Sequence, residues 1–276
     1  METQAMERIA DIDCFLLDMD GTIYLSDVLI DGATAFLQAV EAAGKSFLFL
    51  TNNSSRNAAY YQQKLSRLGI EVPLDKILTS GQAAGNYLCR VYPQKRVWVL
   101  GNEYLKEELT RMGVQVVEER PDVVLVGYDN TLTYEKLCDC CDYVRSGLPY
   151  IATHPDFNCP VHGGFVPDLG SFMMLIEGST GRKADVVVGK PEWEIIEAAC
   201  ARTGVAPARM AMCGDRLYTD IAAGKRHGLL SILVLTGESK REDIASAQYA
   251  PDLVLDRLGD LVPVLQSALG SGMREP

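Results

Sequence analysis

The sequence lacks the features that would direct it to a nucleic acid, a membrane or an oxidising compartment. Basic residues are outnumbered by acidic ones, 26 to 37, and the resulting net charge of −11 opposes binding to nucleic acid or anionic lipid. No apolar run approaches the ~18 residues that a membrane-spanning helix needs, and the opening METQAMERIADID carries acids where a secretory signal needs basic and then apolar residues. We therefore expect a cytoplasmic protein that binds neither nucleic acid nor membrane.

The cysteine pattern and the composition both indicate a folded, reduced protein. The eight cysteines form no CxxC pair and lie mostly within apparent strands and helices, so we expect free thiols. Apolar residues make up 47% of the 276 residues, which is ample for a hydrophobic core.

The order of apolar runs predicts an α/β fold. Continuous apolar runs, typical of strands buried on both faces, occur at 13–18, 46–51, 185–188, 210–213, 229–235 and 252–255. Helical patterns with capping residues or a terminal glycine lie between them, at 33–43, 57–68 and 192–203. This alternation predicts a doubly wound parallel sheet of the Rossmann-like type.

A second set of α/β elements interrupts the first. Its strands are predicted at 96–100, 114–117, 123–126 and 149–153, and its helices at 102–112 and 133–146. We therefore predict a core formed by residues 1–80 and 182–276, with a smaller α/β domain inserted at 81–181.

The first predicted strand ends in Asp18-Met19-Asp20-Gly21-Thr22. Alternate side chains of an extended chain point the same way, so Asp18 and Asp20 can both face the space beyond the strand, and Gly21 permits close backbone approach. Two neighbouring carboxylates repel each other unless a cation or a shared proton intervenes, which favours a divalent metal site. The alternative is a solvated acidic turn.

Two further segments offer groups that bind anions. Thr51-Asn52-Asn53 and the serines after them place hydroxyls and amides just before a predicted helix, where they can bind an anion or simply cap the helix. Lys190 follows the third predicted strand, where it can neutralise an anion or remain a solvated surface charge.

A fourth segment supplies more carboxylates. Asp215 directly follows the strand predicted at 210–213, and Asp220 is predicted in the first turn of the next helix, where helix capping is an alternative. Ligands of an open parallel sheet bind beyond the carboxyl ends of its strands, and all four segments are predicted at that end. Together they would suit one metal ion and one anion the size of phosphate.

These segments resemble the four ordered motifs of the haloacid dehalogenase-like (HAD) phosphatases. TNNS, VGKP and GDRLYTDI are similar to the NagD-like branch, which includes nitrophenyl, phosphoglycolate, pyridoxal-phosphate and nucleotide monophosphatases. The resemblance covers nearly the whole chain, including the position of the inserted C2-type cap domain. Tyr218 departs from it, because Asp is frequent there.

The resemblance implies a Mg²⁺-dependent phosphomonoester hydrolase. Asp18 would be the nucleophile that forms an aspartyl-phosphate, and Asp20 the general acid and base. Mg²⁺ would be held by Asp18, the backbone carbonyl of Asp20 and Asp215. Thr51, the Asn52 amide, Lys190 and Gly21 would bind the phosphoryl oxygens. Asp220 and Asn53 would support these residues.

The inserted domain is expected to select the substrate. Residues 153–162 read as a polar loop, in which His154, Asp156 and Asn158 are candidates for substrate contacts or for turn formation. A zinc site of His154, Cys159 and His162 is not favoured, because no fourth ligand is evident nearby. The resemblance also implies a homodimer formed through this domain.

Other functions remain open on the sequence. A phosphate-binding or regulatory module without turnover is disfavoured because binding alone does not need both Asp18 and Asp20. A phosphotransferase is a further alternative. A dinucleotide oxidoreductase is discarded, because it would need a GxGxxG turn after the first strand and Asp18–Asp20 occupies that place instead. Sugar phosphates, nucleotide monophosphates, phosphoglycolate and nitrophenyl phosphate all remain candidate substrates.

Overall fold

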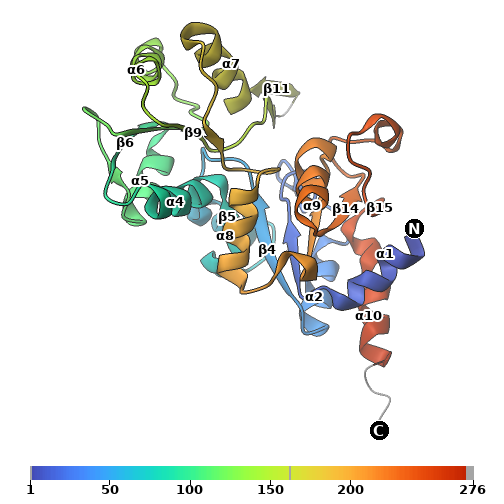
Figure 1. Ribbon diagram of the computed structural model, residues 1–276. Helices are drawn as coiled ribbons and strands as arrows, with labels where there is room; N and C mark the ends of the chain where they lie inside the picture. The colour runs from blue at the N-terminus through green and yellow to red at the C-terminus, as the bar shows by residue number, and fades with distance from the viewer. Residues whose placement is uncertain (1, 162, 272–276) are drawn as a thin grey trace. The chain divides into compact units, whose positions relative to one another are not determined.

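The computed structural model describes residues 2–161 and 163–271 (Figure 1). Contacts divide the chain into two compact units. The first contains Met1–Leu50, Gln62–Ile77 and Ala199–Pro276, and the second contains Thr51–Tyr61 and Leu78–Ala198. The domain limits predicted from the sequence differ from this division mainly at 51–61 and 182–198, and they stay a prediction.

Most of the first unit is built on a six-stranded sheet. Its order is β15 (Leu253–Leu255), β14 (Leu230–Val234), β13 (Met210–Gly214), β1 (Cys14–Leu17), β4 (Ser46–Thr51) and β5 (Ile77–Thr79). The pairs from β15 to β4 are parallel, with Leu17 opposite Cys213 on one side and Phe49 on the other. Every residue of β1, β13 and β14 is buried, as expected for a parallel sheet covered on both faces. The predicted α/β fold is confirmed.

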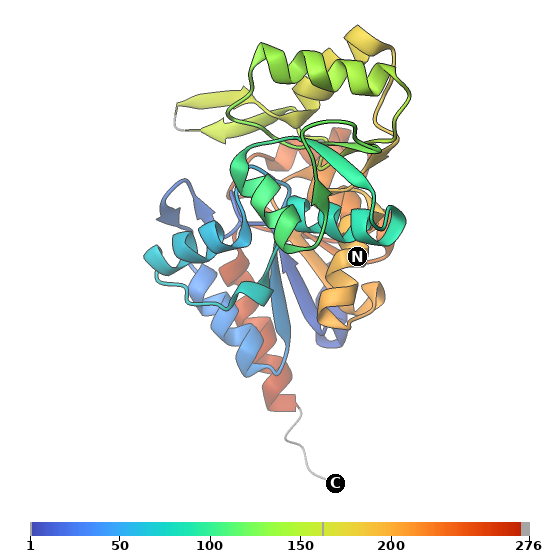
Figure 2. The same cartoon turned by 90° about the vertical axis from the view of Figure 1, so that its left-hand side faces the viewer.

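The second unit contains a five-stranded parallel sheet. Its order is β12 (Val186–Val187), β9 (Tyr150–Ala152), β8 (Val123–Val126), β6 (Arg96–Leu100) and β7 (Gln115–Val116). Figures 1 and 2 show α6 (Tyr134–Arg145) and α7 (Leu169–Thr180) over one face, and α4 (Ser80–Val91) and α5 (Glu103–Arg111) over the other. Side chains of α6 and α7 pack with those of the sheet in one hydrophobic cluster.

The assignment of strand 185–188 to the first sheet was wrong. The structure pairs Val186 with Ile151 and Val187 with Ala152, so β12 is an edge strand of the second sheet. Its place in the six-stranded sheet is taken by β5, which the sequence analysis did not identify. Lys190 therefore follows a strand of the five-stranded sheet, whereas Asp18, Thr51 and Asp215 follow or end strands of the six-stranded sheet.

The helices predicted at 33–43, 57–68, 102–112, 133–146 and 192–203 form within one residue of those limits, whereas α4 was not predicted. Local side chains cap the start of several helices. The side chains of Thr79, Asn102 and Thr133 each accept a backbone N–H at the start of α4, α5 and α6. The remaining helices are α1 (Glu2–Arg8), α2 (Ala33–Ala42), α3 (Ala58–Arg67), α8 (Trp193–Thr203), α9 (Ala222–His227) and α10 (Val262–Ser271).

Two antiparallel hairpins complete the fold, and one corrects a prediction. β2 (Tyr24–Leu25) and β3 (Val28–Leu29) form the first. β10 (Asn158–Val161) and β11 (Gly164–Pro167) form the second, and β10 lies within the segment 153–162 that was predicted to be a loop. His162 lies outside the described residues.

Two expectations from the sequence concern disulfides and membrane-spanning helices. The eight cysteines, all described, lie outside disulfides, as expected. In the described part of the chain, none of the helices combines the length and the apolar character that crossing a bilayer requires.

Candidate active site

The first unit brings three carboxylates together where two neighbouring strands end. Asp18 follows β1, and its N–H donates to the carbonyl of Cys213 in β13 at 2.9 Å. Asp215 follows β13, and oxygens of Asp18, Asp215 and Asp220 all lie within 4.8 Å of one another. Asp215 and Asp220 are buried, and Asp18 is half-buried. Because Mg²⁺ prefers carboxylate oxygens, these residues fit the metal that the fold family implies.

Glycines make room for two of these carboxylates. A Cβ at Gly214 would lie 2.1 Å from Cγ of Asp220, and a Cβ at Gly21 would lie 2.4 Å from Oδ2 of Asp215. Gly21 also has a φ of +87°, which other residues rarely adopt. Close packing of the acidic side chains therefore requires glycine at both positions.

Asp220 lies in a π-helical turn, Leu217–Ile221, rather than in the ordinary first turn that the sequence predicted. One carboxylate oxygen, Oδ2, accepts the N–H of Arg216 at 3.1 Å. π-Helical turns are rare in proteins as a whole, and those that occur are often found at functional sites. Here the turn precedes α9 and contains the third member of the carboxylate cluster.

Asp20 has a different environment from the three clustered carboxylates. Burial raises the pKa of its carboxyl group, while the charges of Lys64 and Arg216 and the N–H of Ser26 oppose that rise. A raised pKa keeps a carboxyl group protonated to higher pH, which suits a general acid. The carboxylate cluster contains the side chain of Asp220 and not that of Asp20. This agrees with the resemblance, which implies only the backbone carbonyl of Asp20 as a metal ligand.

In the second unit, the side chain of Asn52 holds the backbone of Lys190. Oδ1 of Asn52 accepts the N–H of Lys190 at 2.8 Å, and Nδ2 donates to the carbonyl of Lys190 at 2.9 Å. Nδ2 also donates to both carboxylate oxygens of Asp156, at 3.2 and 3.3 Å. All three residues are buried, so Asn52 fixes the position of the Lys190 backbone.

The rest of the Thr51–Ser55 run is stabilised by local hydrogen bonds. Oγ1 of Thr51 accepts the N–H of Asn53 at 3.2 Å, and Oδ1 of Asn53 accepts the N–H of Ser55 at 2.8 Å. Oγ of Ser54 accepts the N–H of Tyr128 at 2.9 Å, which joins this run to the loop after β8. The cap of α3 is Asn57, whose Oδ1 accepts the N–H of Tyr60, rather than Ser54 or Ser55.

The candidates for substrate contacts differ in exposure. His154 is fully buried, with Nδ1 at 3.0 Å from Oγ1 of Thr153 and Nε2 at 3.0 Å from Oδ1 of Asp168. Asp156 is buried against Asn52, and Asn158 is exposed in β10. Asp168, which caps α7, was missed by the sequence analysis, although an Asp before a helix is a recognisable capping signal.

The predicted site residues are divided between the two units. Asp18, Asp20, Gly21, Asp215 and Asp220 belong to the first, and the second contains Thr51, Asn52, Asn53, Lys190, His154, Asp156 and Asn158. The structure brings Asp18, Asp215 and Asp220 together in the first unit, and Asn52, Lys190 and Asp156 together in the second. The convergence of both groups on one phosphoryl group stays a prediction.

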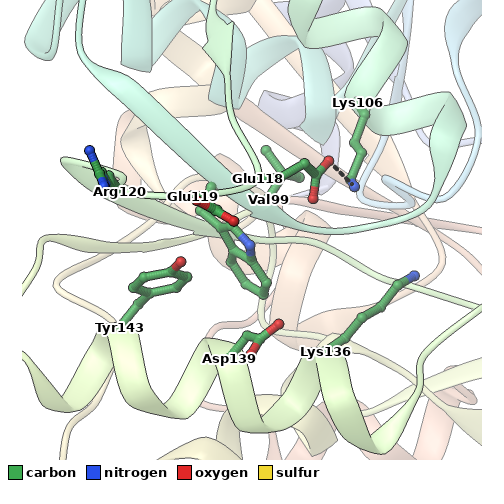
Figure 3. A pocket seen from close by; sticks show the side chains of 9 residues that line it. Val99, Lys106, Glu118, Glu119, Arg120, Lys136, Asp139 and Tyr143 are labelled. Carbon is green, nitrogen blue, oxygen red and sulfur yellow. Dashed lines mark hydrogen bonds and ion pairs between the residues drawn. The ribbon is translucent and has the colours of Figure 1, made fainter.

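The second unit also contains a cavity of about 660 Å³, drawn in Figure 3. It is lined by Trp98, Val99, Lys106, Glu118, Glu119, Arg120, Lys136, Asp139 and Tyr143, with an ion pair between Lys106 and Glu118. Basic and acidic side chains are equal in number along its wall, so it has no net attraction for a phosphate dianion. Among the described residues, none of those predicted for the phosphate site lines it.

Two family models match the chain. Residues 15–115 match the haloacid dehalogenase-like hydrolases, and residues 187–261 match a HAD-hydrolase-like model. The sugar-phosphatase AraL of Bacillus subtilis is 34% identical over 256 residues, which cover 92% of this chain and 93% of AraL.

Solved structures agree with these matches. The 4-nitrophenylphosphatase of Thermotoga maritima is 46% identical, with a TM-score of 0.91 over 94% of this chain and 99% of that one. NagD from Escherichia coli is 31% identical, with a TM-score of 0.84 over 90% of this chain and 98% of that one. The chain therefore belongs to the haloacid dehalogenase-like hydrolases, as a phosphatase of the NagD-like branch.

Proposed function

We propose that this phosphatase hydrolyses the phosphomonoester of a small metabolite, with Mg²⁺ and through an aspartyl-phosphate on Asp18. The observation that carries the proposal is the group of three carboxylates, Asp18, Asp215 and Asp220, within 4.8 Å beside the ends of adjacent strands. When bound there, Mg²⁺ would lower the repulsion between the anionic ester and the attacking carboxylate.

In the first step, a carboxylate oxygen of Asp18 attacks phosphorus. The bond between phosphorus and the ester oxygen breaks, and Asp20 gives its proton to the leaving oxygen, so an alcohol departs. The raised pKa of Asp20 supports this role, because a protonated carboxyl is needed at the moment of departure. Lys190 would balance the charge of the phosphoryl oxygens.

In the second step, water attacks phosphorus of the aspartyl-phosphate. Asp20, now ionised, takes a proton from that water, and the bond between phosphorus and the Asp18 oxygen breaks. Inorganic phosphate leaves, and both carboxyl groups return to their starting states. One displacement forms a labile acyl phosphate and a second hydrolyses it, and these two steps replace one difficult hydrolysis of the ester.

The experiment is phosphate release from 4-nitrophenyl phosphate by purified variants. Asp18→Asn and Asp20→Asn should both lose turnover while far-UV circular dichroism stays unchanged, and Asp75→Asn, an exposed acid of the same unit, is the matched control. EDTA should abolish activity and added Mg²⁺ restore it. Full activity of Asp18→Asn, or of the EDTA-treated protein, would refute the mechanism.

The substrate is proposed as a phosphorylated sugar first, since AraL is named a sugar-phosphatase. A phosphate-release screen over sugar phosphates, nucleotide monophosphates and phosphoglycolate, ranked by kcat/KM, tests this choice. Transfer of the phosphoryl group to an added sugar in place of water would instead indicate a phosphotransferase. The homodimer through the inserted domain stays a prediction, which sedimentation velocity tests.

A further inference from the structure

In the first unit, the loop after β14 holds Asp215 in place through its main chain. We call the residues Thr236–Ser239 the strap. The N–H of Glu238 donates to Oδ2 of Asp215 at 2.6 Å, and the N–H of Ser239 donates to the carbonyl of Asp215 at 3.1 Å. The strap therefore fixes both the carboxylate and the backbone of one predicted metal ligand.

The strap also contacts the two segments that carry the other acids of the first unit. Oγ1 of Thr236 donates to the carbonyl of Gly21 at 2.5 Å, in the loop after β1. Oγ of Ser239 accepts the N–H of Leu217 at 3.3 Å, at the start of the turn that contains Asp220. One short segment thus links the Asp18–Gly21 loop to the Asp215–Asp220 loop.

Gly237 leaves no room for a side chain beside Asp215. A Cβ at this position would lie 1.9 Å from Oδ2 and 2.5 Å from Cγ of Asp215, far inside van der Waals contact. Unlike Gly21, Gly237 is absent from the positive-φ glycines among the described residues, so the requirement for glycine here is steric rather than conformational. Gly21 and Gly237 both approach Oδ2 of Asp215 too closely to carry a side chain in that direction.

We propose that the Thr236–Ser239 strap is a positioning element for the divalent cation, a role that rests on the proposed function. Because the Glu238 amide fixes one oxygen of Asp215, the direction of the other oxygen is fixed as well. Because Thr236 and Ser239 reach the neighbouring loops, the strap sets Asp215 relative to Asp18 and Asp220. Ligands that are already held in position bind an ion without reorganising. In other metal sites, groups hydrogen-bonded to the ligands hold them in this way.

The test is Mg²⁺ binding by isothermal titration calorimetry, with no substrate present. Gly237→Ala adds one methyl group against Asp215, and we expect its Kd for Mg²⁺ to rise about 10- to 100-fold. Gly178→Ala in α7 is the matched control, since a Cβ there meets no atom within 4 Å. The thermal midpoints of both variants in EDTA report on folding, and the upward shift on adding Mg²⁺ should shrink only in Gly237→Ala.

A second pair of variants keeps the test decisive if Gly237→Ala folds poorly. Thr236→Val removes the hydroxyl that contacts Gly21 and should weaken Mg²⁺ binding about three- to tenfold, the loss of one hydrogen bond. Thr236→Ser keeps that hydroxyl and should bind Mg²⁺ as the unmodified protein does. Equal affinity in Thr236→Val and Thr236→Ser, or unchanged affinity in a folded Gly237→Ala, would overturn the strap's role. Failure of the unmodified protein to bind Mg²⁺ would instead refute the proposed function and, with it, this inference.

Discussion

Replacing Asn52 by Asp should test the contacts that hold Lys190 in the second unit. The change is almost isosteric, but it replaces an NH₂ group by an oxygen. That group donates to both carboxylate oxygens of Asp156, at 3.2 and 3.3 Å, and to the carbonyl of Lys190 at 2.9 Å. Asn52→Asp therefore places a second carboxylate against a buried one and removes the N–H that Asn52 donates to the carbonyl of Lys190.

Charge repulsion and proton uptake set the same limit on the loss of stability at pH 7.5. At an effective dielectric constant of about 20, two unit charges roughly 3.3 Å apart repel by about 5 kcal/mol. The pair can instead bind a proton, which at pH 7.5 costs about 5 kcal/mol for a carboxyl with an ordinary pKa near 3.9. At pH 5 the same protonation costs only about 1.5 kcal/mol. The folded variant binds more protons than its unfolded chain, so its stability should rise as the pH falls.

The assay is urea denaturation followed by tryptophan fluorescence, because both tryptophans, Trp98 and Trp193, lie in the second unit with Asn52. We expect Asn52→Asp to lose about 4–5 kcal/mol at pH 7.5 and about 2 kcal/mol at pH 5. Adding Asp156→Asn should restore most of the loss, since a carboxamide can donate to the new carboxylate.

The control is Asn102→Asp. Asn102 is also buried, but its Nδ2 donates to the carbonyl of Ser55 and to Oδ1 of Asn130, neither of which is charged. The control should lose less stability, and Asp156→Asn should not rescue it. An Asn52→Asp variant as stable as the unmodified protein at pH 7.5, or one that Asp156→Asn fails to rescue, would refute this account of the Lys190 loop.

Two further predictions concern stability away from the site. The Arg96 side chain, and then its backbone N–H, lower the pKa of Asp122 to about 2, so this pair stabilises the fold above pH ~4 and the effect is lost as the pH falls through about 2. Asp122→Asn should lower the thermal midpoint at pH 7, and the difference should vanish near pH 2. Phe36 is fully buried and packs edge-on against Phe15, with ring centroids 5.4 Å apart. Phe36→Ala should cost about 3–5 kcal/mol in urea denaturation and Phe36→Leu about 1 kcal/mol; equal losses would contradict this packing.

Local sequence predicted the elements whose limits depend on neighbouring residues. β4, β6 and β8 begin and end at their predicted residues, because continuous apolar runs with polar ends define buried strands. α5 and α6 start after Asn102 and Thr133, whose side chains cap them. Such signals lie within a few residues of the boundary that they set, so no tertiary contact is needed to read them.

The errors occurred where distant contacts decide the structure. An apolar run at 185–188 indicates a strand but not its partner, and pairing with β9 placed β12 in the other sheet. β10 contains Pro160, which lowered its strand signal, yet pairing with β11 makes the hairpin. β5 has only three residues, too few for a period to be recognised.

The same distinction applies to the candidate site. The spacing within DMDGT and GDRLYTD was enough to propose that Asp18 and Asp215 meet, because both follow strands predicted in one parallel sheet. The role of Asn52 in holding Lys190 was not predictable, because the two residues are separated by 138 positions in the sequence. The strap lacked any signal, since a glycine after a strand is explained equally well by a turn.

Each half of the predicted site is arranged in advance within its own unit. In the first unit, main-chain amides of the strap fix Asp215, and in the second, a side-chain amide fixes the backbone of Lys190. Buried hydrogen bonds of this kind keep the groups from reorienting when charge develops on a phosphoryl group, which is how a preorganised site lowers a barrier. The two halves should therefore fail differently. Strap variants should change the Mg²⁺ concentration that gives half-maximal activity, whereas Asn52 variants should change the KM for the phosphate ester at saturating Mg²⁺.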